Sequence, residues 1–176
     1  MPLNSRGEQS KVSEVILFTG NAFSVADGKG RFVLPLEMRR QVKLSSGNEN
    51  RLYLSVHGGN PCAIGFGESH RRHLFTEVEE LAREARAAGR DYNADLELEY
   101  RLGTIEEVNF DEGGRFAMHP DIRDEYGIAD AVFFYGVGRY IQMWKPETLV
   151  DSKDRPELIR NKVRRWLDQR RAEGGK

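Results

Sequence analysis

The chain has 176 residues, 39% of them hydrophobic, and its 27 Lys and Arg against 28 Asp and Glu give a formal net charge of −1. These values fit one globular domain or two small fused ones, and they exclude disorder along the whole chain and a globally basic, histone-like DNA binder. A single cysteine, Cys62, excludes an intramolecular disulfide framework. No apolar run approaches the ~18 residues of a membrane helix, so we expect a cytoplasmic protein.

The N-terminal part begins with a polar segment and continues with a turn flanked by apolar residues. Residues 1–14 lack the apolar stretch of a signal peptide, and we expect a disordered extension there. The sequence Asp-Gly-Lys-Gly at 27–30 is typical of a tight turn whose glycine takes a positive φ. The pattern after this turn predicts a strand at 32–34, a helix at 36–42 opened by Pro35, and strands at 52–56 and 62–66.

A helical connector is expected at residues 67–102. Apolar residues recur at helical spacing from 68 to 88, and Gly89 ends this pattern. Residues 91–102 are ambiguous, because their apolar residues alternate from 96 to 102 as in a strand, whereas Asn93 is a suitable helix N-cap. Periodicity alone favours a strand there, and the family resemblance described below favours a helix.

An internal repeat is the main feature of the sequence. Residues 23–39 match residues 107–123 at a spacing of 84, with five identities among the thirteen positions from 27 to 39. The identical pairs are Asp27 and Asp111, Gly30 and Gly114, Arg31 and Arg115, Phe32 and Phe116, and Arg39 and Arg123. We interpret the match as a duplication, with one unit at 15–66 and the other at 103–150.

The second unit repeats the predicted order of the first and is followed by a last helix. Its turn at 111–114 precedes a strand at 116–118, a helix at 121–126, and strands at 132–135 and 140–144. The C-terminal segment, residues 151–176, has apolar residues at helical spacing that predict a helix at 156–171. We expect its apolar side to pack on the body of the protein or on a neighbouring subunit.

At the two turns the sequence resembles the MraZ family of bacterial transcriptional regulators. The resemblance covers about residues 17–150 and rests mainly on Asp-Gly-Lys-Gly-Arg at 27–31 and Asp-Glu-Gly-Gly-Arg at 111–115. Shorter matches are the Phe18-x-Gly20 opening, Asn-Pro-Cys at 60–62 and the pair Met143-Trp144.

The resemblance implies an α+β fold in which two tandem AbrB/SpoVT-like swapped-hairpin units form a pseudo-two-fold β-barrel, with helices between and after them. It also implies a ring-shaped homo-oligomer at the nucleoid that binds short, G-rich direct repeats in promoter DNA. The implied target is the gene cluster for cell division and the cell wall.

Charge distinguishes the two units without reference to the family. Residues 27–43 hold five basic and two acidic residues, whereas residues 111–127 hold two basic and five acidic ones. Because DNA presents a dense row of phosphates, only the first unit is suited to bind double-stranded DNA alone. The candidate DNA-binding residues are Lys29, Arg31, Arg39, Arg40 and Lys43, and the candidate structural residues of the turns are Asp27, Gly30, Asp111, Gly114 and Arg115.

Two interpretations of Arg31 compete. Its guanidinium has the planar shape suited to bidentate contact with guanine O6 and N7. Alternatively, Arg31 pairs with Asp27 and fixes the shape of the turn, and the same Asp and Arg occur in the acidic second turn. In the same way, Arg39, Arg40 and Lys43 either contact DNA or form a solvated helix face.

No other pattern in the sequence indicates catalysis or a cofactor. The four histidines lack the spacing and partners of a metal site and are expected at the surface, and Cys62 is expected as a small core residue. We therefore expect no enzyme, cofactor, membrane or small-molecule substrate. The main alternative to a DNA-binding regulator is an oligomeric adaptor that binds a protein, in which the acidic unit of one subunit could dock on the basic unit of the next.

Overall fold

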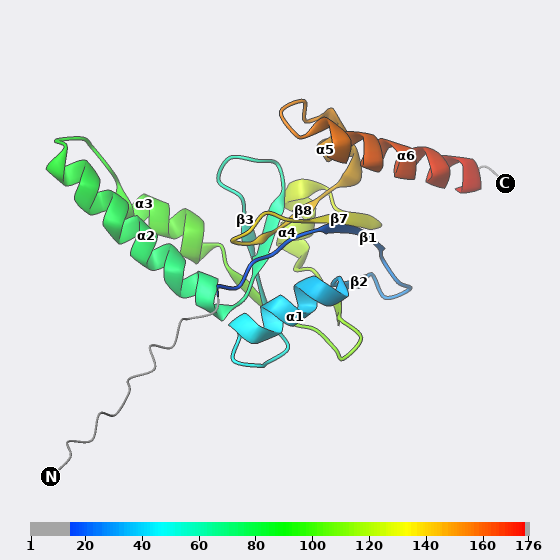
Figure 1. The fold of residues 1–176 in the computed structure, drawn as a ribbon, viewed down its shortest axis with the longest axis horizontal. Helices are drawn as coiled ribbons and strands as arrows, with labels where there is room; N and C mark the ends of the chain where they lie inside the picture. Colours follow the sequence, from blue (N-terminus) through cyan, green and yellow to red (C-terminus); the bar gives the residue numbers. More distant parts are fainter. Residues whose placement is uncertain (1–14, 175–176) are drawn as a thin grey trace, which may run out of the picture.

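The computed structural model describes residues 15–174, so the extension expected at 1–14 lies outside the described residues. A β-sheet lies at the centre, with a helical arm projecting on one side and a helix pair on the opposite side (Figure 1). The elements in chain order are β1 (Asn21–Val25), β2 (Phe32–Val33), α1 (Leu36–Ser45), β3 (Arg51–Val56), β4 (Ala63–Phe66), α2 (Glu68–Ala87), α3 (Ala94–Leu98), the π-helical turn η1 (Glu99–Gly103), β5 (Glu106–Asn109), β6 (Arg115–Phe116), α4 (Pro120–Tyr126), β7 (Ala131–Gly136), β8 (Ile141–Trp144), α5 (Pro146–Asp151) and α6 (Glu157–Gly174).

The two repeats exchange their first strands. β1 of the first repeat pairs antiparallel with β7 of the second, and β5 of the second pairs antiparallel with β3 of the first. Each repeat also forms its own hairpin, β3–β4 or β7–β8, and the hairpins join through β4 and β8. The result is one six-stranded sheet of order β1-β7-β8-β4-β3-β5, in which equivalent strands occupy equivalent places.

The six-stranded sheet is open, whereas a β-barrel was expected. β1 and β5 lie at its two edges. The strand after each turn has only two residues, β2 or β6, because Pro35 and Pro120 lead the chain into α1 and α4 directly afterwards. β2 and β6 pair with each other in a separate ladder, in which Phe32 lies opposite Phe116. Ladders of this length do not join the two edges of the sheet.

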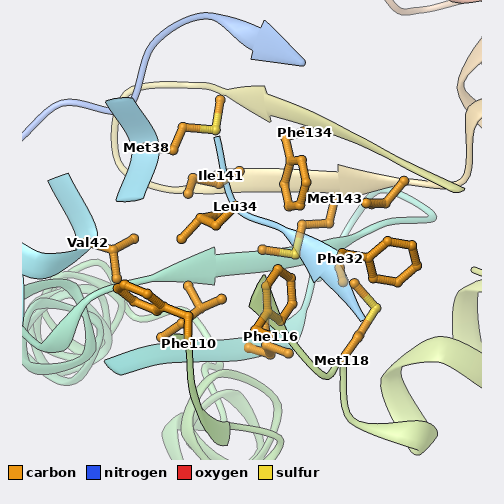
Figure 2. Close-up of a cluster of buried hydrophobic side chains, with 14 of the residues drawn as sticks. Phe32, Leu34, Met38, Val42, Phe110, Phe116, Met118, Phe134, Ile141 and Met143 are labelled. Carbon is orange, nitrogen blue, oxygen red and sulfur yellow. The ribbon is translucent and has the colours of Figure 1, made fainter. Parts of the chain in front are cut away.

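One face of the sheet packs on a hydrophobic cluster that both repeats share. Phe32 and Phe116 belong to it, with ring centroids 6.4 Å apart, and Phe134 packs 6.3 Å from Phe116 (Figure 2). Helix α1 contributes Met38 and Val42. Burial of each large apolar side chain is worth about 1.5–3 kcal/mol, so a cluster assembled from both repeats makes their folding interdependent.

The side chains that alternate with this cluster point to the opposite face of the sheet, which the helices after each repeat cover. On the half formed by β3 and β4, Leu74 of α2 packs with Tyr53 and Phe66. On the half formed by β7 and β8, α6 packs its apolar side, and the Trp166 ring stacks on Phe23 of β1 at 4.3 Å. Of the two places predicted for the apolar side of the last helix, the body of the protein is the one observed.

The connector is helical at residues 94–103. The strand that the alternation of apolar residues favoured there is not formed, and the helix that Asn93 and the family resemblance favoured is. The Oδ1 of Asn93 accepts a hydrogen bond of 3.1 Å from the backbone N–H of Leu96, which caps α3. Arg101 of η1 then pairs with Glu77 of α2 at 3.2 Å. The apolar residues of this segment therefore lie along a short helix held against α2, which alternation alone does not reveal.

Three helices also differ from the prediction. α1 continues three residues beyond the predicted end, to Ser45, and stops before Gly47, which has a φ of 65°. α5 was not predicted at all, because its six residues carry too short an apolar pattern. The last helix runs from Glu157 to Gly174, one residue after its predicted start and three residues beyond its predicted end.

Candidate nucleic-acid interface

The turn of residues 27–31, here called the first turn, is fixed by the side chain of its leading aspartate. Asp27 Oδ1 accepts hydrogen bonds of 2.9 Å from the backbone N–H groups of both Lys29 and Arg31. The N–H of Gly30 also donates to the carbonyl oxygen of Asp27 at 2.9 Å. Gly30 has a φ of 73°, a region that favours glycine because it has no Cβ. Lys29 is exposed at the tip of this turn.

The turn of residues 111–115, the second turn, has the same construction. Asp111 Oδ1 accepts 2.9 Å hydrogen bonds from the backbone N–H groups of Gly113 and Arg115, and Gly114 has a φ of 83°. The difference lies at the tip, where Gly113 stands at the position equivalent to Lys29. The backbone geometry is thus common to both repeats, and only the first turn carries a cation at its tip.

The two arginines of the turns are held to different degrees. The Nε and Nη2 of Arg31 lie 2.9 and 2.8 Å from Asp27 Oδ2, whereas Arg115 Nη1 lies 3.6 Å from Asp111 Oδ2. The Arg31–Asp27 pairing considered from the sequence is therefore present. Hydrogen bonds from the Arg31 backbone N–H, and then from its guanidinium, lower the pKa of the Asp27 carboxyl from 3.8 to about 2. At neutral pH the carboxylate is charged and orients one edge of the guanidinium.

An arginine from each repeat braces the turn of the other repeat. Arg123 on α4 donates from Nη1 to the carbonyl oxygen of Gly30 at 2.8 Å, and its guanidinium lies 5.2 Å from the centre of the Phe32 ring. Arg39 on α1 donates from Nη1 to the carbonyl oxygen of Glu112 at 3.0 Å. Arg39, one of the predicted DNA contacts, lies against the second turn in this arrangement, and its contact with DNA stays a prediction.

The five predicted basic residues consequently fall in three places. Lys29 and Arg31 share the first turn, and Arg39 contacts the second turn. Arg40 is exposed on α1 and pairs with Glu37 at 3.5 Å, and Lys43 lies in the last turn of the same helix. Figure 1 shows both turns projecting on the same side of the sheet, with α1 beside them. That side is the candidate interface.

The sequence did not lead us to predict that Arg123 braces the first turn, although the internal repeat pointed to it. Arg39 and Arg123 occupy equivalent positions of the two repeats, 84 residues apart, and they lie on equivalent helices. Arg123 also donates from Nε to the carbonyl oxygen of Ile128 at 3.1 Å and from Nη2 to that of Ala129. Arg123 thus joins the first turn, through Gly30, to the segment between α4 and β7.

The described residues were also compared with the requirements of a metal site, a membrane helix and a reactive cysteine. Between residues 15 and 174, no group of three or more His, Cys, Asp or Glu side chains is arranged to hold a metal ion. Within the same residues, no helix combines the length and apolar character needed to cross a membrane. Cys62 is fully buried beside Trp144, and burial raises the pKa of its thiol to about 12.

No protein-family model matches the chain. The chain is similar to the transcriptional regulator MraZ of Bacteroides fragilis, with 30% identity over 135 residues that cover 76% of this chain and 80% of that protein. It is also similar to the transcriptional regulator MraZ of Rhodospirillum rubrum, with 27% identity over 78% of this chain and 85% of that protein. For the MraZ protein of Saccharophagus degradans, the identity is 23% over 81% of this chain and 94% of that protein.

Proposed function

The chain belongs to the MraZ family, and from that premise we propose that it regulates transcription by binding double-stranded DNA through the side of the molecule that carries the two turns. The observation that carries the proposal is the pair of turns, which share one backbone geometry but differ in charge. Lys29 at the tip of the first turn would contact phosphate or a groove. Arg31, oriented by Asp27, would contact a guanine edge with the N–H groups that Asp27 leaves free.

The finer parts of the proposal follow the family. We propose that the repeats are AbrB/SpoVT-like units, which the exchange of β1 and β5 between repeats supports. We further propose a ring-shaped homo-oligomer at the nucleoid that binds short, G-rich direct repeats upstream of the division and cell-wall genes. One basic turn per chain supports an oligomer, because several weak contacts on one DNA molecule combine through their effective concentration.

An adaptor that binds a protein is the second candidate. The observation in its favour is the helical arm of α2, α3 and η1, which leaves Phe75 49% exposed and Tyr100 56% exposed. Apolar side chains on a projecting arm are typical of a contact surface. Such a surface also fits subunit contacts in the proposed oligomer, so DNA binding has to be measured directly.

The test is fluorescence anisotropy of labelled DNA from upstream of the division genes, with scrambled DNA as the control, over a series of salt concentrations. Arg31→Lys is more informative than Arg31→Ala, because lysine keeps a positive charge beside Asp27 but lacks the planar guanidinium. We expect Arg31→Lys to lose about 1–3 kcal/mol of discrimination against scrambled DNA. The matched variant Arg115→Lys should retain the discrimination.

A second variant separates phosphate contact from base contact. Lys29→Gln should weaken binding to both DNAs alike and reduce the slope of log K against log salt by about 0.9, the loss of one phosphate contact. If the wild-type protein shows no preference over scrambled DNA at any salt concentration, the regulator proposal fails for that site and the adaptor becomes the better explanation.

A further inference from the structure

A cavity of about 900 Å³ lies between the helical arm and the sheet, away from the two turns. The arm closes it on one side through α2 and η1, and the β3–β4 and β7–β8 connections and the end of α4 line the rest. Both repeats and the connector therefore contribute to it. Pockets for small molecules in proteins typically measure roughly 300–1,000 Å³, so the volume is sufficient for a ligand.

Two phenol groups in the wall offer hydrogen-bond donors. His57 Nδ1 accepts hydrogen bonds from the backbone N–H groups of Gly59 and Asn60, each at 2.9 Å, which assigns the imidazole proton to Nε2. That nitrogen lies 3.1 Å from Tyr140 Oη and 3.2 Å from the side-chain amide of Asn60. Tyr126 Oη accepts the backbone N–H of His57 at 3.2 Å. Tyr126 Oη thus acts as an acceptor, and within residues 15–174 its hydroxyl proton has no hydrogen-bond acceptor of its own. Tyr140 Oη lies within hydrogen-bond distance of His57 Nε2 and also contacts the side chain of Gln142. Burial raises the pKa of both phenols, so they keep their protons.

The charges in the wall leave no net attraction for an anion. Glu77 pairs with Arg101 at 3.2 Å and with Arg139 at 3.1 Å, and Arg101 also pairs with Glu97 at 3.1 Å. Glu125 adds a third carboxylate to the lining against the two guanidinium groups. Burial also lowers the pKa of the two lining histidines, to about 4 for His70, so they are uncharged at neutral pH. The wall is therefore slightly negative.

Flat rings make up much of the remaining surface. Tyr100, Tyr126 and Tyr140 line the cavity together with the imidazoles of His57 and His70. The two histidines were expected as surface residues, but both are partly buried here. The Nε2 atom of His70 is buried without a hydrogen-bond partner among the described residues. Rings of this kind stack on planar ligands.

We propose that this cavity binds a small, uncharged heteroaromatic molecule of the chemical class of nucleobases and nucleosides, which packs on the rings and accepts hydrogen bonds from Tyr126 and Tyr140. Ring nitrogens and carbonyl oxygens of such a molecule match the phenol protons. The ion-paired, slightly acidic wall disfavours an anionic ligand. The lining residues lie outside the two turns, so ligand binding at this site can be measured without DNA.

Isothermal titration calorimetry of the full chain with adenosine and with thymidine tests the proposal. We expect saturable binding of at least one of the two probes, weakened about fivefold by Tyr126→Phe and again by Tyr140→Phe, since each change removes one hydrogen-bond donor. Tyr135→Phe is the matched control, because Tyr135 packs in the hydrophobic cluster on the other half of the sheet. Adenosine monophosphate should bind at least about fivefold more weakly than adenosine, because its phosphate meets the acidic wall.

Thermal unfolding of each variant checks that its fold is intact. Tyr100→Ala is a further test of the binding site. Tyr100 is largely exposed, so removing its ring takes away part of the cavity wall without opening the core. It should weaken nucleoside binding as well. The proposal is overturned if neither probe binds at concentrations up to roughly 5 mM. It is also overturned if folded Tyr126→Phe/Tyr140→Phe protein binds as wild type does, or if the monophosphate binds more tightly than the nucleoside.

Discussion

Arg123 of the second repeat donates a 2.8 Å hydrogen bond from Nη1 to the carbonyl oxygen of Gly30 in the first turn. The acidic repeat thus contributes to the geometry of the basic turn without supplying a charge at its tip. The contact spans 93 residues of sequence and joins α4 to the segment just before β2. Any DNA contact made by Lys29 or Arg31 rests on a turn that the other repeat holds in place.

Arg123→Gln should therefore weaken binding to specific DNA although Arg123 is outside the tip of the turn. Glutamine cannot reach the carbonyls of Gly30, Ile128 and Ala129 together, and we expect a loss of about 2 kcal/mol in the free energy of unfolding. Urea unfolding and anisotropy measure the two effects. Arg83→Gln, on the exposed side of α2, is the control that changes the same charge. Unchanged stability and unchanged DNA affinity would contradict the bracing role.

Phe32 and Phe116 should be energetically coupled, since they lie opposite each other in the β2–β6 ladder with their rings in contact. We expect Phe32→Leu and Phe116→Leu each to lower the free energy of unfolding by about 1–3 kcal/mol. The double variant should differ from the sum by at least about 0.5 kcal/mol. A double-mutant cycle in urea measures this coupling, and strict additivity would mean that the two repeats pack independently.

The hydrogen bonds from the backbone of the first turn to Asp27 should be insensitive to pH from neutrality down to about 4, and they should weaken as the pH falls further, through about 2. The pKa of the Asp27 carboxyl is lowered to about 2 in the folded protein from an ordinary value of 3.8. The stabilisation by this carboxylate is therefore fully present above pH 3.8 and is lost as the pH falls through about 2. The backbone amide resonance of Arg31 in NMR spectra reports on it, because that N–H donates to Asp27.

Asp27→Asn is the control for that titration, because asparagine keeps an oxygen acceptor for the backbone N–H groups but has no proton to gain. In this variant the Arg31 amide resonance should stay constant from pH 4 to pH 2. A wild-type titration with a midpoint near 4 would show that the carboxylate is free of its partners in solution.

Cys62 should react with thiol reagents only when the protein unfolds. Its side chain is fully buried, and burial raises the pKa of the thiol to about 12, so the reactive thiolate is almost absent at pH 8. Reaction with a disulfide reagent at pH 8 should be slow in buffer and fast in denaturant. Stoichiometric reaction of the native protein within seconds would contradict the placement of Cys62 in the core.

Local patterns in the sequence determined the turns and most of the elements. Asp27 with Gly30, and Asp111 with Gly114, act within five residues, so their hydrogen bonds depend on little outside the turn. The amphipathic helices α2 and α6 were predicted for the same reason, because helical periodicity is a property of one segment. The repeat spacing of 84 likewise revealed the duplication, and the contrast in charge identified the first turn as the basic one.

Only the tertiary structure decided how the two units combine. The exchange of β1 and β5, the open sheet, the bracing of each turn by the other repeat and the cavity beneath the helical arm all depend on residues far apart in the chain. Sequence periodicity states which face of an element is apolar, but it does not specify which element covers that face. That choice depends on packing and hydrogen bonding across the whole molecule. Examples are the hydrogen bond from Arg123 to the Gly30 carbonyl and the pairing of Phe32 with Phe116.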